Sequence, residues 1–439
     1  MRMLLAPLRR WFERDTRGEA IFPLAVLTAI YFFDEFDTAA FGTLAPDIKR
    51  SFHLTDERFI GLIIINVSLI VLLAVPAGYL ADRVSRVKIV IVSGVLAGAF
   101  SLFTGLATSV AFLTLARFGN GIGVLANGPI HNSMLADYYT VDARPSVFAN
   151  HTNALYLGAI AGPAVAGAAG ALLGWRAAFF VLFIPILITT VIATRMHEPV
   201  RGATDAMAGG SVVPPGPPPR FIAAVRTLWR VRSLRRTLWG AVFIGAGLLP
   251  LAGYLPLYLE RVYHLGPFPR GVIGAVNAAF TFVGVQQGGR RTPGWFARGM
   301  HVPMQKVGLA VAAAGPGLLV VAASPWLALS VVGGFAAFYS LGWLFAPLAA
   351  TQALVSPARE RSLAFSLGAI FLVLGVVIFY VVGLGSVSDH HGIRWAIAVL
   401  TPLWVIGGLV IRTAGPFVAA DTQAALNQSY DRTHEPDPD

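Results

Sequence analysis

The sequence predicts an all-α protein that crosses a membrane many times. Of its 439 residues, 56% are hydrophobic and only 13% are charged, whereas a soluble domain carries about 25% charged residues. The mean hydropathy is +0.68. Apolar residues gather in long runs, and a helix of roughly 20 such residues spans a bilayer core. Too few charges remain to cover a water-facing surface, so we expect a bundle of transmembrane helices.

Glycines and prolines divide the apolar runs into twelve candidate spans. The first six are expected near residues 20–43, 59–80, 89–107, 111–136, 147–173 and 177–195. The second six are expected near residues 237–258, 270–286, 306–323, 326–354, 362–385 and 395–412.

The basic residues give these spans an orientation. With the N-terminus placed in the cytoplasm, 25 of the 33 Lys and Arg residues fall on the cytoplasmic side, seven fall outside, and Arg117 lies within a span. Cytoplasmic loops are enriched in basic residues. We therefore expect both termini in the cytoplasm. The same bias explains the net charge of +11 without a nucleic-acid partner.

The spans and loops divide the chain into five parts. We expect a basic amphipathic segment at 1–18, a six-helix bundle at 19–195, a Pro/Arg-rich cytoplasmic loop at 196–236, a second six-helix bundle at 237–412, and a disordered cytoplasmic tail at 413–439. The halves echo each other: Gly174-Trp175-Arg176 opens the sixth span, and Gly392-Ile393-Arg394 opens the twelfth. Related halves are a common plan of secondary transporters.

Charged residues inside spans are the main candidate site. Asp34, Glu35 and Asp37 lie in the first span, and Arg117 lies in the fourth. A charge at the centre of a spanning helix costs roughly 2.5–3.5 kcal/mol, so such residues usually serve a function. The alternative is a structural ion pair accompanied by water.

Other polar residues form a second list of possible cavity-lining groups. Each one alone is more often a helix–helix hydrogen-bonding residue than a ligand contact. They are His131, Asn153, Tyr156, Tyr254, Asn277, Tyr339 and Tyr380. The chain has no cysteine, and it shows no catalytic triad order, zinc-protease motif or phosphate-binding loop. We therefore expect no metal, no organic cofactor and no enzyme activity.

The loop between the second and third spans contains Gly78, Asp82, Arg83 and Arg86. A glycine permits close approach of helices, and a carboxylate there can bind an arginine or a helix N-terminus. The alternative is a solvated loop whose charges only fix topology. The fifth span contains a glycine pattern that the alternative of plain helix packing also explains. Its residues are Gly158, Gly162, Pro163 and Gly167.

These motifs resemble those of the major facilitator superfamily over about residues 20–412. Gly78, Leu80, Ala81, Asp82, Arg83 and Arg86 match the loop motif, with Ser85 in place of a second glycine. The glycine pattern resembles the motif common in antiporters. The surroundings of Asp37 and Arg117 look like those of Spinster-like lipid transporters and of organic-anion and drug/proton carriers. Spinster-like members usually carry a glutamate where this chain has Val124.

The resemblance implies two pseudo-symmetric six-helix bundles that alternate access to a central cavity. It also implies inner gate partners for Asp82, drawn from Arg144, Arg359 and Arg361. We expect a secondary transporter, driven by a proton gradient, that moves an amphipathic or organic small molecule, with export favoured. Alternatives are a Spinster-like lysolipid transporter and a non-transporting membrane enzyme or scaffold. We expect a monomer in the plasma membrane, with the lipid bilayer and a small-molecule substrate as its partners.

One mechanism follows as a hypothesis. Asp37 and Arg117 each lie six residues from the expected outer end of their spans, which places both roughly 9 Å below the surface. Asp34 lies one turn deeper. We expect Asp34 to carry the proton and Asp37 with Arg117 to form the gate or the substrate anchor, and Glu35 is the alternative proton carrier.

Overall fold

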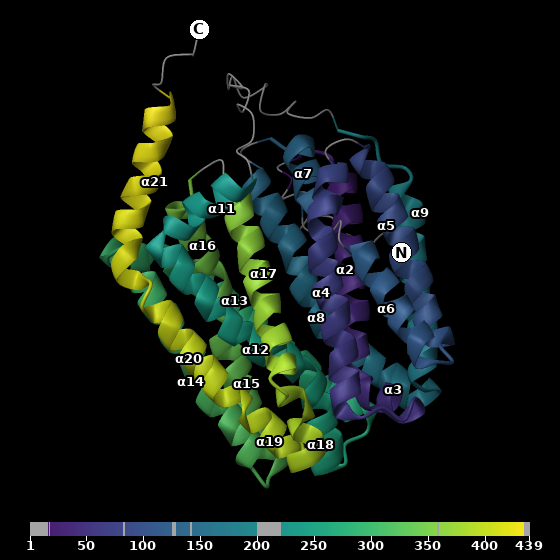
Figure 1. Ribbon diagram of the computed structural model, residues 1–439. Coiled ribbons are helices and arrows are strands. Elements are labelled where there is room, and N and C mark those ends of the chain that lie inside the picture. The colour runs from purple at the N-terminus through teal and green to yellow at the C-terminus, as the bar shows by residue number, and fades with distance from the viewer. Residues whose placement is uncertain are drawn as a thin grey trace. The chain divides into compact units, whose positions relative to one another are not determined.

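The computed structural model describes the backbone of residues 16, 18–81, 84–124, 129–140, 143–199, 221–357 and 360–433. Within these residues every regular element is an α-helix or a short 3-10 helix (Figure 1). Nine of the described helices are long and apolar enough to cross a membrane. Many of their apolar side chains stay exposed, for example Leu172 at 82%, which suits contact with lipid rather than water. The predicted all-α membrane fold is confirmed.

The chain forms two compact units. The first comprises residues 1–54, 65–214 and 265–275. Its helices are α2 (Ile21–Thr43), α3 (Ala45–Ser51), most of α4 (Asp56–Ala81), α5 (Arg86–Leu106), α6 (Val110–Val124), α7 (Pro129–Tyr138), α8 (Arg144–Leu173) and α9 (Trp175–Ala193). Within this unit α2 packs along α8, and α5 packs against both α6 and α9.

The second unit comprises residues 55–64, 215–264 and 276–439. Its first helices are α11 (Phe221–Arg230), α12 (Arg232–Tyr263), most of α13 (Pro267–Arg298), α14 (Val302–Ala323), α15 (Leu327–Gly342) and α16 (Phe345–Val355). The remaining elements are α17 (Arg361–Val381), η2 (Leu384–Ser386), α18 (Val387–His391), α19 (Ile393–Ala398), α20 (Leu400–Arg412), η3 (Gly415–Phe417) and α21 (Val418–Thr433). Here α14 packs against α15 and α20, and α12 packs against α17 and α20 (Figure 1).

Each of the twelve expected spans corresponds to described helical residues. In order they are α2, α4, α5, α6 with α7, α8, α9, α12, α13, α14, α15 with α16, α17, and α19 with α20. Some helices extend beyond the expected ends: α12 begins at Arg232 and α13 continues to Arg298. The backbone hydrogen bonds of a helix do not stop where the apolar run stops, so hydropathy alone misplaces these ends. The tenth span is divided near Trp343, whose carbonyl cannot be paired by Pro347 because proline lacks an N–H.

Two equivalent corners confirm that the halves share a local design. Gly174 has a φ of 83° and Gly392 a φ of 89°, a left-handed region that favours glycine. Two residues later, Arg176 donates to the carbonyl of Ala107 at the end of α5. In the second unit, the Arg394 guanidinium donates to carbonyls at the end of α14. Each arginine therefore satisfies helix C-terminal carbonyls that would otherwise lack partners.

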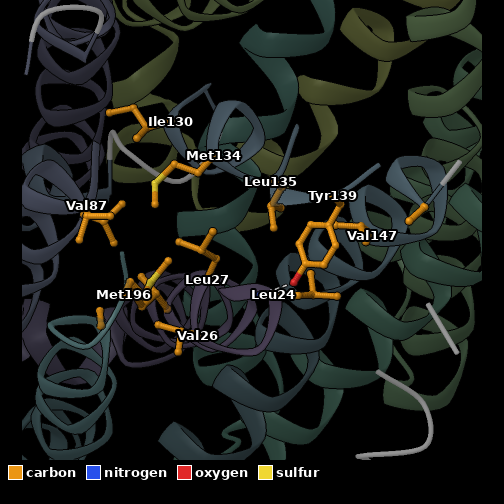
Figure 2. Close-up of a cluster of buried hydrophobic side chains, with 14 residues drawn as sticks. Leu24, Val26, Leu27, Val87, Ile130, Met134, Leu135, Tyr139, Val147 and Met196 are labelled. Carbon is orange, nitrogen blue, oxygen red and sulfur yellow. Dashed lines mark hydrogen bonds between the residues drawn. The ribbon is translucent and has the colours of Figure 1, made fainter. Parts of the chain in front are cut away.

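A buried apolar cluster closes one end of the first unit (Figure 2). Its members come from α2, α5, α7, α8 and α9 and include Leu27, Val87 and Met134. Tyr139 joins the cluster to the start of α2, because its hydroxyl donates to the carbonyl of Ala20 and accepts the backbone N–H of Leu24.

A polar network lies beside this cluster and ties α5, α7 and the segment after α9 together. The Arg86 guanidinium binds the Asp137 carboxylate at 2.5 Å and the Glu198 carboxylate at 3.0 Å. Glu198 also accepts the backbone N–H of Val87 and the hydroxyl of Ser85. Burial alone would raise the pKa of Glu198, but these hydrogen bonds together hold the pKa below its ordinary value.

The end of the chain differs from the sequence-based expectation. The described part of the segment 413–439, which we expected to be disordered, contains the helix α21. The Asp421 carboxylate accepts the backbone N–H and the hydroxyl of Ser233 at the start of α12. The Arg236 guanidinium lies 4.5 Å from the centre of the Phe417 ring. The polar composition of the tail concealed these long-range anchors. Residues 1–15 and 200–220, which hold most of the expected basic segment and central loop, lie outside the described residues.

The glycines of the fifth span serve close packing. A Cβ atom on Gly158 would lie 2.4 Å from the carbonyl oxygen of Phe32, and one on Gly162 would lie 2.7 Å from that of Phe36, both in α2. One on Gly167 would lie 2.6 Å from the carbonyl oxygen of Pro267. No real Cβ sits this close to backbone, so these positions accept only glycine without movement of a helix.

We expect Gly158→Ala to destabilise the protein by about 1–3 kcal/mol, because α2 and α8 must separate to admit the methyl group. Thermal unfolding in detergent measures the change. Gly266→Ala is the matched control, since a Cβ there meets nothing within 4 Å. Equal melting temperatures for wild type and Gly158→Ala would contradict the packing role.

We expect Glu198→Gln to remove an acid-sensitive part of the stability. The pKa of Glu198 is lowered in the folded state, so its contribution is full above the unfolded pKa of about 4.3 and is lost as pH falls through the lower folded value. Melting temperatures between about pH 6 and about pH 3 should therefore fall less steeply in Glu198→Gln than in wild type. Parallel curves would exclude this role, and Glu57→Gln, outside the network, is the control.

Candidate functional site

The acid cluster of α2 points toward two different neighbours. The Asp34 and Asp37 side chains are both buried, at 3% and 0% exposure. They are three residues apart and so share one face of the helix. Glu35 lies on the side that packs against α8, because a Cβ on Gly158 would lie 3.1 Å from its Cβ. The cluster therefore divides into an Asp face and a Glu face.

Asp37 and Arg117 form an ion pair in the interior of the first unit. The Arg117 guanidinium donates to one carboxylate oxygen of Asp37 at 2.8 Å, and the Ser101 hydroxyl donates to the other. The pair thus joins α2, α5 and α6. The Arg117 guanidinium also lies 4.5 Å from the centre of the Phe41 ring, a distance at which a cation is attracted to the ring face.

This pair satisfies the electrostatic demands of burial only while both partners remain. Each isolated charge would be costly inside a bundle, and removing one partner of a buried pair typically destabilises a protein by about 3–5 kcal/mol. Arg117 uses one terminal nitrogen for Asp37, whereas a guanidinium has five N–H donors in a planar fork. Binding Asp37 through one terminal nitrogen therefore does not use every N–H donor of Arg117.

Glu35 belongs to a second polar group between α2, α8 and α7. It interacts electrostatically with the phenols of Tyr31 and Tyr156. The Tyr31 ring lies 4.9 Å from the His151 ring, and the His151 ring lies 5.2 Å from the His131 ring. The sequence predicted His131 and Tyr156 as separate polar candidates. In the structure Tyr156 interacts with Glu35, and His131 is connected to Tyr31 through the ring of His151.

The other polar candidates lie in both units. Asn153 lies in α8 of the first unit, whereas four residues belong to the second unit. There, Tyr254 and Asn277 are buried, Tyr339 donates to the side chain of Gln287, and the Tyr380 hydroxyl lies at the backbone of Gly61.

The loop motif is only partly described. Asp82, Arg83 and Arg359 lie outside the described residues, and Gly78 and Arg361 are described in their backbone alone. Arg86 takes part in the network with Asp137 and Glu198. The Arg144 guanidinium, expected as an inner gate partner, donates to the carbonyls of Ala136 and Tyr139 at the end of α7.

Sequence reasoning missed several residues that complete charged contacts. Ser101 and Phe41 surround the Asp37–Arg117 pair, although neither belongs to a motif. The sequence did not single out Asp47, Asp56, Arg261 or Arg270 as site residues. The Arg261 guanidinium binds both oxygens of Asp56, and Arg270 binds Asp47. Asp56 lies in the first turn of α4 and is fully buried. Its burial indicates an ion-pair partner, since charged residues are rarely buried unless they are paired. The described residues contain no group of three or more metal-ligating side chains.

Known proteins resemble this chain in sequence and in fold. The 4-hydroxybenzoate transporter PcaK of Pseudomonas aeruginosa is 28% identical over 39% of this chain and 39% of its own length. The 3-(3-hydroxy-phenyl)propionate transporter of Escherichia coli is 32% identical over 37% of this chain and 40% of its own length. The chain therefore spans about two-fifths of the length of these curated relatives.

The fold resembles that of solved transporters over nearly the whole chain. A crystal structure of a bacterial homologue of the human lysosomal transporter Spinster, in an inward-facing and unoccupied conformation, superposes with a TM-score of 0.73. It is 21% identical and covers 92% of this chain and 97% of its own. The profile of the Major Facilitator Superfamily matches residues 27–300, which is more than half of the sequence. The chain belongs to the Major Facilitator Superfamily.

Proposed function

We propose that this protein is a secondary active transporter that moves a small organic carboxylate, with an aromatic acid as the favoured class. The proton gradient supplies the energy, and the protein acts as a monomer in the plasma membrane with both termini in the cytoplasm. The twelve helical spans and the membership of the superfamily support a multi-pass transporter rather than an enzyme.

The buried Arg117 guanidinium carries the proposal. It is paired through one nitrogen with Asp37 and lies over the Phe41 ring. An arginine fork matches the geometry of a carboxylate and can bind it through two parallel hydrogen bonds. An aromatic ring beside the fork offers an apolar contact for the remainder of an aromatic acid. A substrate anion and Asp37 would therefore share one cation.

The names of the relatives support the same substrate class. PcaK is named for 4-hydroxybenzoate and the Escherichia coli relative for 3-(3-hydroxy-phenyl)propionate, and both compounds are hydroxylated aromatic carboxylates. The similarity to the Spinster homologue concerns the fold and adds no evidence for a lipid substrate. Val124 also stands where Spinster-like members usually carry a glutamate, so a lysolipid is the less favoured substrate.

The proposal does not depend on the direction of transport. Export is the direction favoured by the acid cluster, Arg117 and the partial antiporter motif of the fifth span together, and the glycines Gly158 and Gly162 of that motif pack against α2. Proton coupling is supported by the three carboxylates of α2, since a membrane span contains acids rarely and usually for function.

We expect purified protein in proteoliposomes to accumulate 4-hydroxybenzoate or 3-(3-hydroxyphenyl)propionate when a pH gradient is imposed, because each carries the carboxylate that Arg117 can bind. Uptake and efflux of labelled substrate are measured with gradients of both signs. The neutral amide of 4-hydroxybenzoate is the control and should not move. Movement of a lysophospholipid without movement of either acid would replace the proposed substrate class.

We expect Arg117→Lys to fold but to bind the acid substrate more weakly, because an ammonium cannot form the two parallel hydrogen bonds of a guanidinium. A loss of about 1–3 kcal/mol, or roughly fivefold to 150-fold in apparent affinity, is the expected range. The double variant Asp37→Asn/Arg117→Gln removes both charges without leaving either one unpaired, and it should retain the fold while losing transport. Normal transport by the double variant would make the pair purely structural.

A further inference from the structure

The polar group next to Glu35 contains an imidazole whose hydrogen-bonding groups are unused. His131 in α7 is fully buried, and neither of its ring nitrogens forms a hydrogen bond with any described residue. A neutral imidazole has one donor and one acceptor, and leaving either one buried and unpaired costs about 1–3 kcal/mol. Such a group in a native structure indicates a function or an occupant that fills its bonding capacity.

The surroundings of His131 indicate what that occupant is. Its ring faces the ring of His151 at 5.2 Å, and His151 in turn lies 4.9 Å from the ring of Tyr31. Tyr31 interacts electrostatically with Glu35 and Asp34. Two titratable side chains, His151 and Tyr31, therefore connect His131 in α7 to the carboxylates in the first span. Chains of histidines and carboxylates inside membrane helices are typical of proton routes.

Apolar side chains close this group on one side. Ile130 and Met134, which flank His131 along α7, belong to the buried cluster that seals the end of the first unit (Figure 2). Both are fully or almost fully buried. A proton needs no cavity of its own, whereas a substrate would need one. The close apolar packing around His131 therefore suits a proton better than an aromatic acid.

We propose that His131, together with His151, forms a single-proton station on the route of the coupled proton, and that this proton is exchanged with the carboxylates of Glu35 and Asp34. In the forward step a protonated carboxyl gives its proton to an imidazole nitrogen, leaving a carboxylate and an imidazolium, and the reverse step returns it. Total charge is unchanged. Two imidazoles 5.2 Å apart repel each other when both are charged, so the pair holds one proton at a time.

The neighbouring helices define which charged groups act on the station. From α2 come Tyr31, Asp34 and Glu35, and from α8 comes Tyr156. From α5 comes Arg86, but its charge is already compensated by Asp137 and Glu198. Asp137 lies six residues from His131, roughly 9 Å along the helix. The carboxylates of α2 are therefore the acids that the ring contacts through Tyr31 connect to the histidine pair.

The inference rests on the proposed transport function, and its test separates the two. In proteoliposomes we expect His131→Asn to lose accumulation of 4-hydroxybenzoate driven by a pH gradient, and also the substrate-induced proton flux reported by an internal pH dye. Exchange of labelled for unlabelled substrate at equal pH should continue, because the Arg117 anchor is intact. Asp34→Asn should show the same separation. His264→Asn is the control: that histidine is exposed and has a φ of 54°, which asparagine tolerates.

A second measurement does not require transport. Carbon and nitrogen NMR of imidazole-labelled protein in lipid nanodiscs resolves the nine histidines, and His131→Asn identifies the His131 signal by its absence. We expect that signal to titrate, and its midpoint to move in His151→Asn. A His131 signal that stays neutral at every pH at which the protein remains folded would overturn the proton station.

The combined outcomes are distinct. One outcome is that wild type moves neither acid while His131 still titrates. In that case the proposed function is wrong, and so is the coupling of this proton to an acid substrate. The proton-binding site itself is then still supported by the titration. If wild type accumulates an acid and His131→Asn accumulates it equally, the function stands and the station is overturned. If His131→Asn unfolds, the His131 signal is identified instead as the remaining signal that moves in His151→Asn, and its titration in wild type still decides.

Discussion

A guanidinium inside a membrane-spanning bundle must be accompanied by its counter-charge, and this constraint organises the first unit. Arg117 on α6 is neutralised by Asp37 on α2, and Ser101 on α5 fills the remaining carboxylate oxygen. Three helices are thereby held at one point through charge rather than shape. Because a low-polarity interior penalises any separation of the pair, the relative positions of these helices are fixed more firmly there than apolar packing alone would fix them.

Close contact between helix backbones is the second interaction that holds α2 in place. On the opposite side of α2, Gly158 and Gly162 allow α8 to approach the backbone of Phe32 and Phe36. Lipid tails are as apolar as leucine, so helix association in a bilayer depends on this kind of packing and on polar contacts. The same physics recurs in the second unit, where a Cβ on Gly245 would lie 1.9 Å from the carbonyl oxygen of Leu372. A helix with charge on one face and glycine contacts on the other has little freedom to move alone.

The sequence predicted the fold class and most spans because hydropathy and the bias of basic residues act on every helix. It also predicted that Arg117 and the acids of the first span would lie at similar depth, and the structure brings Arg117 to Asp37. It could not place Ser101 or Glu198, because a serine in a span and a glutamate after one are common and carry no pattern. It missed the helix α21 because the contact between Asp421 and Ser233 joins residues 188 positions apart. Such contacts depend on tertiary packing, which local composition does not encode.

In the proposed mechanism α2 connects the substrate site to the proton site, because its Asp face contacts Arg117 and its Glu face belongs to the polar group that contains His131. Asp37 contacts the cation that a carboxylate substrate would share, whereas Tyr31 and Glu35 belong to the polar group that ends at His131. A substrate anion bound to Arg117 would weaken the hold of that arginine on Asp37. The negative charge of Asp37 would then be less compensated and would favour protonation of the acids nearby. Because Asp34 lies one turn from Asp37 and interacts with Tyr31, the change in charge at one face is felt at the other without any large movement of α2. In the proposed mechanism, substrate binding and proton uptake would thus be linked through the electrostatics of a single helix.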